Sequence, residues 1–189
     1  MMAELPPTKT PFTSDELVAA LRAAYRGQMG ADATNHAIAM LAAHVALETG
    51  NGVACIQWNV GNFKAYAGTD STEFTTTEYI GGKPVTMRCL FAAYQSLDEG
   101  VRSYLKSMWS HWVRAWNMGV IPGDCVGFAQ GLHDQGYYTA PVSSYMHGVA
   151  RWYAWYMAKL GGDSEATVPE LQPIAVALPD ATPDPPDAA

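Results

Sequence analysis

Residues 37–52 read AIAMLAAHVALETGNG, and this stretch decides the fold. It is rich in Ala and apolar on nearly every side, so we expect a central helix that is buried all round and begins near residues 32–35. At its end, Gly50-Asn51-Gly52 can adopt the left-handed conformations that close a helix. The sequence therefore predicts a helical domain built around this segment.

One acidic side chain, Glu48, lies in the last turn of that apolar helix. Burial disfavours an ionised carboxylate, and the partial negative charge of a helix C-terminus does the same. A carboxyl group that keeps its proton near neutral pH is what general acid catalysis requires. The alternative is a glutamate that merely faces solvent at a helix end, and periodicity alone leaves both interpretations open.

Further elements flank the central helix. Thr13 and Glu16 form a capping-box pattern that starts a helix, and Gly27 is the expected stop. The β-branched and aromatic run at 73–80, the Gly81-Gly82 turn and a returning run at 83–90 predict a hairpin. Apolar spacing predicts three more helices, over residues 96–112, 124–132 and 143–160. The expected fold class is α+β, mainly α, with a small β-hairpin lobe.

Charge and composition divide the 189-residue chain into three parts. Residues 1–12 read as an extended arm, residues 13–162 as one domain, and the Pro- and Ala-rich residues 163–189 as a disordered tail. Six of the eighteen acids lie in the tail, so twelve acids and eleven bases remain in residues 1–162. The near-neutral body has no basic stripe for a nucleic-acid backbone, and we expect no nucleic-acid partner.

Cellular placement and thiol chemistry follow from simple counts. No stretch approaches the roughly 20 apolar residues that span a bilayer. Residues 1–9 lack a basic region followed by an apolar run, so we expect no cleaved secretory signal. The chain is then made in the cytoplasm and reaches any outer target by release, injection or non-classical export.

Three cysteines, without C-x-x-C spacing, favour buried free thiols over one disulfide with a leftover thiol.

Five short segments follow one another along the chain. They are ALETGNG at 46–52, NVGNFKA at 59–65, TTEY at 76–79, FAAYQS at 91–96 and GYYTAP at 136–141. In this order and at these spacings they resemble the glucosaminidase domain of glycoside hydrolase family 73, which includes flagellum-associated and autolytic cell-wall enzymes. The resemblance extends over roughly residues 14–160, most of the expected domain.

The resemblance implies a lysozyme-like helical lobe, a hairpin lobe and, between them, a groove for a peptidoglycan glycan strand. It implies hydrolysis of β-1,4 bonds by an endo-β-N-acetylglucosaminidase mechanism, with Glu48 as general acid, Glu78 as second carboxylate and Tyr137 beside the cleaved bond. No metal or organic cofactor is implied, and a monomer is favoured, with the oligomeric state open. The residues assigned to substrate binding are Asn59, Phe63, Lys64, Tyr79 and Tyr138.

Several alternatives remain open. Glu73 is the reserve second carboxylate, and substrate assistance by the N-acetyl group would make either one secondary. A muramidase or lytic transglycosylase would use the same scaffold, while Asn51, standing where the family usually has an aromatic residue, favours a catalytically silent wall-binding or phage structural module. His44 and Glu48 are spaced to hold a metal, although a polar interior histidine is the favoured interpretation. A phage lysin or an antibacterial effector fits the expected setting.

Overall fold

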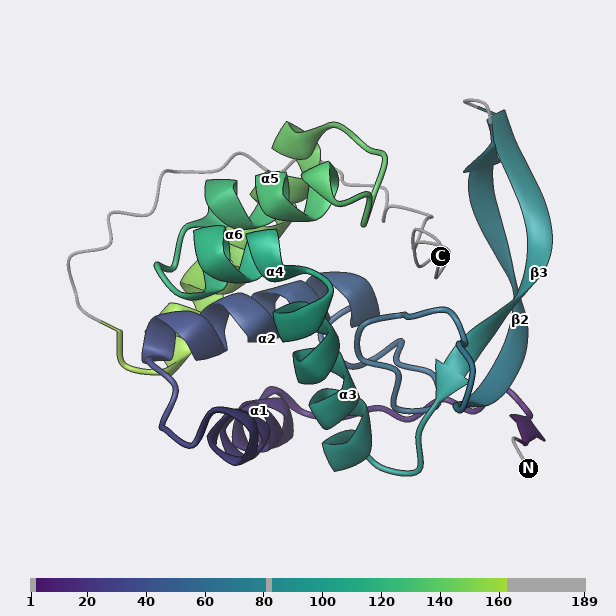
Figure 1. Cartoon of the computed structure of the whole chain (residues 1–189), viewed down its shortest axis with the longest axis horizontal. Coiled ribbons are helices and arrows are strands. Elements are labelled where there is room, and N and C mark those ends of the chain that lie inside the picture. Colours follow the sequence, from purple (N-terminus) through teal and green to yellow (C-terminus); the bar gives the residue numbers. More distant parts are fainter. Residues whose placement is uncertain (1–2, 81–82, 163–189) are drawn as a thin grey trace.

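The computed structural model describes residues 3–80 and 83–162, without the side chains of residues 77–80 and 84 (Figure 1). A helical body carries a projecting β-hairpin, which confirms the expected α+β, mainly α class. The helices are α1 (Ser14–Met29), α2 (Asn35–Thr49), α3 (Leu97–Ser110), α4 (Val113–Ala115), the π-helix η1 (Trp116–Val120), α5 (Cys125–Asp134) and α6 (Val142–Lys159). The strands are β1 (Glu4–Leu5), β2 (Asp70–Ile80) and β3 (Lys83–Ala93). The expected tail and the Gly81-Gly82 turn lie outside the described residues.

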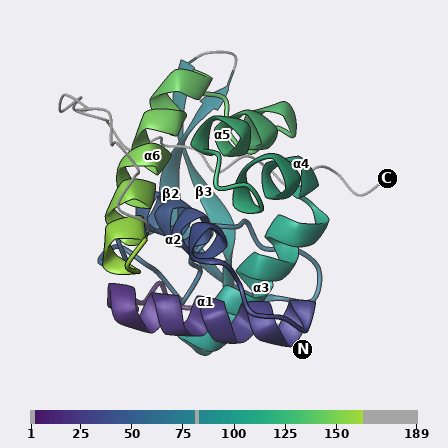
Figure 2. The same ribbon diagram turned by 90° about the vertical axis from the view of Figure 1, so that its left-hand side faces the viewer.

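Helix α2 occupies the centre of the body, with the other helices arranged around it (Figure 2). Every residue from 37 to 47 is buried, which confirms the prediction from its all-round apolar sequence. The helix begins after Thr34, whose hydroxyl accepts a hydrogen bond from the Ala37 N–H at 3.1 Å. It ends at Gly50, which adopts the left-handed conformation. Helices α1, α6 and η1 pack directly against it.

The start of α1 agrees with its capping pattern, but its end does not. Thr13 and Glu16 form the predicted capping box. Gly27 was expected to stop the helix and instead lies inside it, and α1 continues to Met29 before Gly30 closes it with a φ of 69°. The reason is that a glycine costs an exposed helix interior only about 1 kcal/mol, which packing of the opposite face outweighs.

The hairpin is longer than its sequence pattern indicated. Strands β2 and β3 pair antiparallel from Asp70↔Ala93 to Ile80↔Lys83. At the base, the rings of Phe74 and Phe91 stack with their centroids 4.0 Å apart. The hairpin points away from the helices beyond this stack (Figure 1). Its base is therefore anchored to the body, while the described residues of β3 before Phe91 are mostly exposed.

The N-terminal arm contacts the body of the domain along its length. Strand β1 pairs parallel with β2. Further along, the Thr8 carbonyl accepts a hydrogen bond from the Gln57 N–H at 2.9 Å, and the Thr10 hydroxyl accepts one from the Trp58 N–H at 2.7 Å. The arm thus supports the segment that follows α2.

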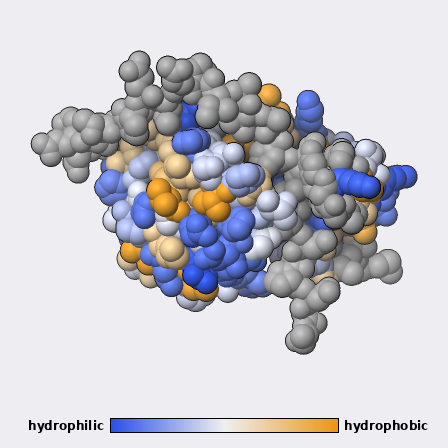
Figure 3. Space-filling model, turned by 90° about the horizontal axis from the view of Figure 1, so that it is seen from above, coloured by the Kyte–Doolittle hydropathy of each residue, from blue (hydrophilic) through white to orange (hydrophobic). Residues whose placement is uncertain are grey.

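Among the described residues, no helix is both long and apolar enough to cross a membrane. Seen from above, the apolar residues of the visible face are dispersed among hydrophilic ones (Figure 3). Apolar residues scattered in this way are normal on a folded domain.

Two thiols make stability sensitive to alkaline pH. Burial raises the pKa of the free Cys55 thiol to about 11 and that of the free Cys125 thiol to about 12. An unfolded chain releases these protons near pH 9 while the folded chain keeps them, so the free energy of unfolding falls as the pH rises from 9 towards 11. Each such group contributes about 1.4 kcal/mol per pH unit within this window.

Urea unfolding at pH 7, 9 and 10.5 measures this loss. We expect the Cys55→Ala variant to be less stable at pH 7, because a buried side chain is truncated, and to show a shallower decline above pH 9. The same decline in both proteins would contradict the assignment of the effect to Cys55.

Candidate active site

Glu48 lies in the last turn of α2, at the end of the helix that faces the base of the hairpin (Figure 1). Its side chain is only 10% exposed. The interpretation of Glu48 as a solvent-facing residue at a helix end is therefore wrong, and the interpretation as a nearly buried carboxyl group is confirmed.

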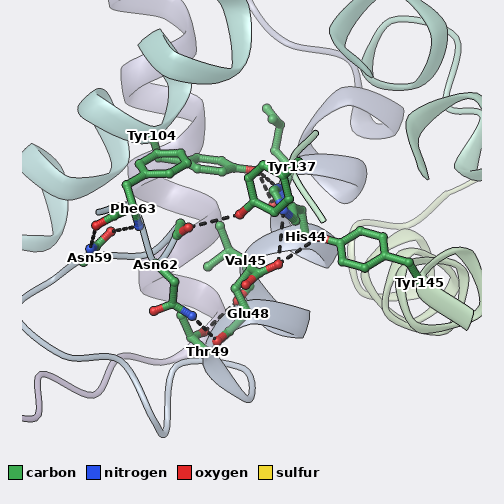
Figure 4. A network of polar contacts seen from close by, with 12 residues as sticks. His44, Val45, Glu48, Thr49, Asn59, Asn62, Phe63, Tyr104, Tyr137 and Tyr145 are labelled. Atoms are coloured by element: carbon green, nitrogen blue, oxygen red, sulfur yellow. Dashed lines mark hydrogen bonds and ion pairs between the residues drawn. The ribbon is translucent and has the colours of Figure 1, made fainter. Parts of the chain in front are cut away.

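Helix α6 supplies a hydrogen bond to this carboxyl group. The Tyr145 hydroxyl donates to Glu48 Oε1 at 2.8 Å, and its ring is buried (Figure 4). Burial, followed by the nearby charge of Glu48, raises the pKa of Tyr145 well above its ordinary value, so the phenol remains a hydrogen-bond donor. Among the described residues, no hydrogen bond reaches Glu48 Oε2, the other carboxyl oxygen.

His44 lies one turn before Glu48 and is fully buried. Its Nε2 is 3.5 Å from Glu48 Oε1, and its Nδ1 is 2.8 Å from the Tyr104 hydroxyl on α3 (Figure 4). No group of three potential metal ligands occurs among the described residues. The pair at i, i+4 is instead part of a polar chain that runs from Tyr104 through His44 and Glu48 to Tyr145.

The segment after α2 braces the C-terminal end of the helix. The Asn62 side chain donates to the Glu48 carbonyl at 2.7 Å, and Asn62 itself has a φ of 48°. Asn51 also adopts a left-handed conformation, and its side-chain oxygen accepts from the Tyr156 hydroxyl at 2.7 Å. Asparagine tolerates this conformation better than most residues, so it suits both positions. Asn51 therefore orders the segment, in a position where an aromatic ring was expected by resemblance.

Three of the residues assigned to the sugar are used inside the protein. The Asn59 amide donates to the Phe63 carbonyl at 2.8 Å and accepts from the Phe63 N–H at 3.0 Å. The Tyr137 hydroxyl donates to the Gly61 carbonyl at 3.1 Å, and that of Tyr138 to the Ala129 carbonyl at 2.9 Å. Asn59 is 3% exposed and each tyrosine 2%. The motif match aligned these positions along the chain but could not give their depth, and their contact with a sugar stays a prediction.

These buried residues pack against the side chains that surround Glu48. The Tyr137 ring meets the edge of His44 with centroids 5.0 Å apart, and the Tyr138 ring stacks on Tyr145 at 3.9 Å. Phe63 is half-buried and lies against the Tyr104 ring at 6.1 Å. Together they pack against His44, Tyr104 and Tyr145, the side chains that form the polar chain with Glu48.

The remaining predicted residues lie towards the hairpin. The half-buried Lys64 forms a backbone bridge with Phe91, where the segment after α2 meets β3. Glu78 and Tyr79 pair through their backbones with Val85 and Pro84, but their side chains lie outside the described part of the chain, and their roles stay predictions. Glu73, the reserve carboxylate, forms an ion pair with Arg88 on the neighbouring strand.

Tyr145 and Tyr104 are the site residues that sequence reasoning missed. Both were expected only as positions in helices, since nothing in a helical period shows which polar group a tyrosine meets. The available signal was weak: a carboxyl group inside an apolar helix needs a buried partner, and a tyrosine is one of the side chains that can supply it.

Comparison with known proteins places this geometry in a recognisable fold. No protein-family model and no curated protein matches the sequence. Among solved structures, a peptidoglycan hydrolase mutant from Sphingomonas sp. A1 is similar with a TM-score of 0.56 and 22% identity, over 78% of this chain and 92% of that one. The glycoside hydrolase domain of Salmonella typhimurium FlgJ gives 0.53 and 20%, over 79% and 92%. The catalytic domain of the autolysin Auto from Listeria monocytogenes gives 0.54 and 20%, over 79% and 87%. The chain has the fold of these domains, as the resemblance implied.

Proposed function

We propose that this chain is a peptidoglycan hydrolase that cleaves β-1,4 glycosidic bonds of the glycan strand by general acid catalysis. The observation that carries the proposal is the environment of Glu48: a nearly buried carboxyl group with one oxygen held by Tyr145 and the other without a hydrogen bond among the described residues. Protonation of the leaving glycosidic oxygen needs such a group. The similar folds belong to domains named as peptidoglycan or glycoside hydrolases, which supports the same substrate class.

Within this class, the five-segment resemblance favours an endo-β-N-acetylglucosaminidase that releases reducing N-acetylglucosamine ends. The second candidate is a lytic transglycosylase or muramidase. It is favoured by the fact that Glu48 has no carboxylate partner among the described side chains, because transglycosylases can work with one acid. Products distinguish them, since a transglycosylase forms 1,6-anhydro ends in place of reducing ends.

The test is digestion of purified peptidoglycan, followed by assay of new reducing ends and by mass spectrometry of the fragments. We expect soluble fragments that end in reducing N-acetylglucosamine. Binding to the wall without release of fragments would replace the proposal with the silent wall-binding module.

The hairpin carboxylate Glu78 is the proposed second acidic group. We expect Glu78→Gln to lower turnover on peptidoglycan while wall binding is retained, because the carboxylate acts only on the reacting sugar. The matched control is Glu73→Gln on the same strand, where the carboxylate is already paired with Arg88. Damage from the Glu73 change and none from the Glu78 change would contradict the assignment, and two silent variants would favour substrate assistance.

The proposed setting is a phage lysin or an antibacterial effector that meets the wall after release or injection. The glycan strand is the proposed partner, and a monomer is the proposed state.

A further inference from the structure

The buried imidazole of His44 has a nitrogen that the proposed reaction has not yet used. Among the described residues, His44 Nε2 is fully buried and takes no hydrogen bond. The polar atom it approaches is Glu48 Oε1, at 3.5 Å. A buried polar atom without a partner is rare in a folded protein, and it calls for an explanation in the local chemistry. Hydrogen bonds at catalytic groups are often long before the substrate binds and shorten afterwards.

Tyr104 determines which imidazole nitrogen carries the proton. The Tyr104 hydroxyl is 2.8 Å from His44 Nδ1 and 3.4 Å from the Leu41 carbonyl, so the contact with Nδ1 is the shorter and stronger acceptor contact for its proton. The Leu41 carbonyl also lies inside α2, where the N–H four residues later is its regular partner. The hydroxyl proton therefore points to Nδ1. A neutral imidazole that accepts at Nδ1 carries its own proton on Nε2, facing Glu48.

The aromatic rings around His44 keep this donor in place. Tyr137 and Phe128 meet the imidazole edge-on, with centroids 5.0 Å and 5.3 Å away, and Tyr145 lies at 6.3 Å. The titratable groups that face the His44–Glu48 pair are three phenols. Tyr104 belongs to α3, Tyr137 to the segment between α5 and α6, and Tyr145 to α6. Burial, then the charge of Glu48, raises the pKa of all three well above the ordinary value, so they stay neutral.

We propose that His44 is a positioning residue for Glu48, with Tyr104 holding it in the Nε2-protonated form. The inference rests on the proposed hydrolase function and deepens it. Tyr145 and His44 both direct protons to Oε1, so the proton of the Glu48 acid is placed on Oε2, the oxygen that can meet a leaving group. His44 acts through Glu48 and touches no substrate.

The central test compares three variants in peptidoglycan hydrolysis. His44→Leu keeps the bulk and removes the donor, and we expect kcat to fall about 10–100-fold with KM nearly unchanged, as for a misdirected catalytic group. His44→Gln restores a side-chain N–H at a similar reach and should recover most of that loss. Tyr104→Phe frees Nδ1 and should reduce kcat less than His44→Leu does.

The chain offers a matched control at the other end of α2. The Tyr153 hydroxyl lies 2.6 Å from His36 Nδ1, so Tyr153→Phe breaks a tyrosine–histidine hydrogen bond of the same kind away from Glu48. We expect Tyr153→Phe to keep the wild-type kcat. Equal losses in the two Tyr→Phe variants would overturn the inference. If His44→Leu does not fold, the comparison of kcat between Tyr104→Phe and Tyr153→Phe tests the inference.

The pH profile of kcat separates positioning from a general loss of structure. The alkaline limb should move to higher pH in His44→Leu, because the ionised carboxylate loses a donor. A merely structural role would lower the amount of active protein and leave that limb in place. If the wild type releases no reducing ends, the proposed function fails. If wild type is active and Glu48→Gln is not, while His44→Leu keeps both kcat and the limb, only the present inference fails.

Discussion

The Glu48→Gln variant is expected to clear suspended cell walls about 10²–10⁴-fold more slowly than the wild type, because it has lost the proton donor. The amide oxygen of glutamine can still accept the hydrogen bond from Tyr145, and the substitution keeps the shape of the side chain. Thermal unfolding should therefore change little. The loss can then be assigned to chemistry and not to structure.

A matched control uses a glutamate far from the site. Glu16→Gln in α1 retains the capping box, since glutamine serves in that position as well, and it should clear walls at the wild-type rate. Near-normal clearance by Glu48→Gln would remove Glu48 from the mechanism, whatever the fold resembles.

A second large effect is expected at Gly100 in the first turn of α3, where the helix contacts the segment that braces Glu48. A Cβ added there would lie 1.9 Å from the Trp58 carbonyl oxygen, and Trp58 itself holds a left-handed φ of 53°. The obstacle is backbone, so one of the two segments must shift. We expect Gly100→Ala to lower the free energy of unfolding by about 3 kcal/mol, as for severe overpacking. Displacement of Asn62, which holds the Glu48 carbonyl, should also reduce wall clearance.

Gly27→Ala is the control for this effect. Gly27 lies within α1 with nothing inside 4 Å of an added Cβ, so alanine should stabilise the helix by about 0.5–1 kcal/mol. Opposite signs for the two glycines in urea unfolding would confirm the close contact between Gly100 and Trp58. A Gly100→Ala protein as stable as the wild type would contradict it.

Local patterns predicted the parts of the fold that depend on local forces. The all-round apolar run of α2 requires burial, the Thr13–Glu16 capping box begins α1, and the β-branched run with paired glycines indicates the hairpin. Glu48 was identifiable for the same reason, because a single carboxyl group within an apolar helix can be recognised from the sequence alone.

Features that depend on long-range contacts were not accessible in this way. Tyr145 meets Glu48 across 97 positions of the chain, and Tyr104 meets His44 across 60. Sequence motifs gave Tyr137 and Asn59 a role near the site but not their burial, which the packing of α3, α5 and α6 around α2 decides. The pairing of β1 with β2 likewise depends on the folded hairpin and has no signal in residues 1–12.

The most direct test of the account is digestion of purified peptidoglycan in ¹⁸O-labelled water, followed by mass spectrometry of the fragments. Hydrolysis adds one oxygen of water to each new reducing end. The account predicts singly labelled reducing N-acetylglucosamine ends from the wild type and no such ends from Glu48→Gln. Unlabelled 1,6-anhydro ends, or fragments cut only at peptide bonds, would contradict it.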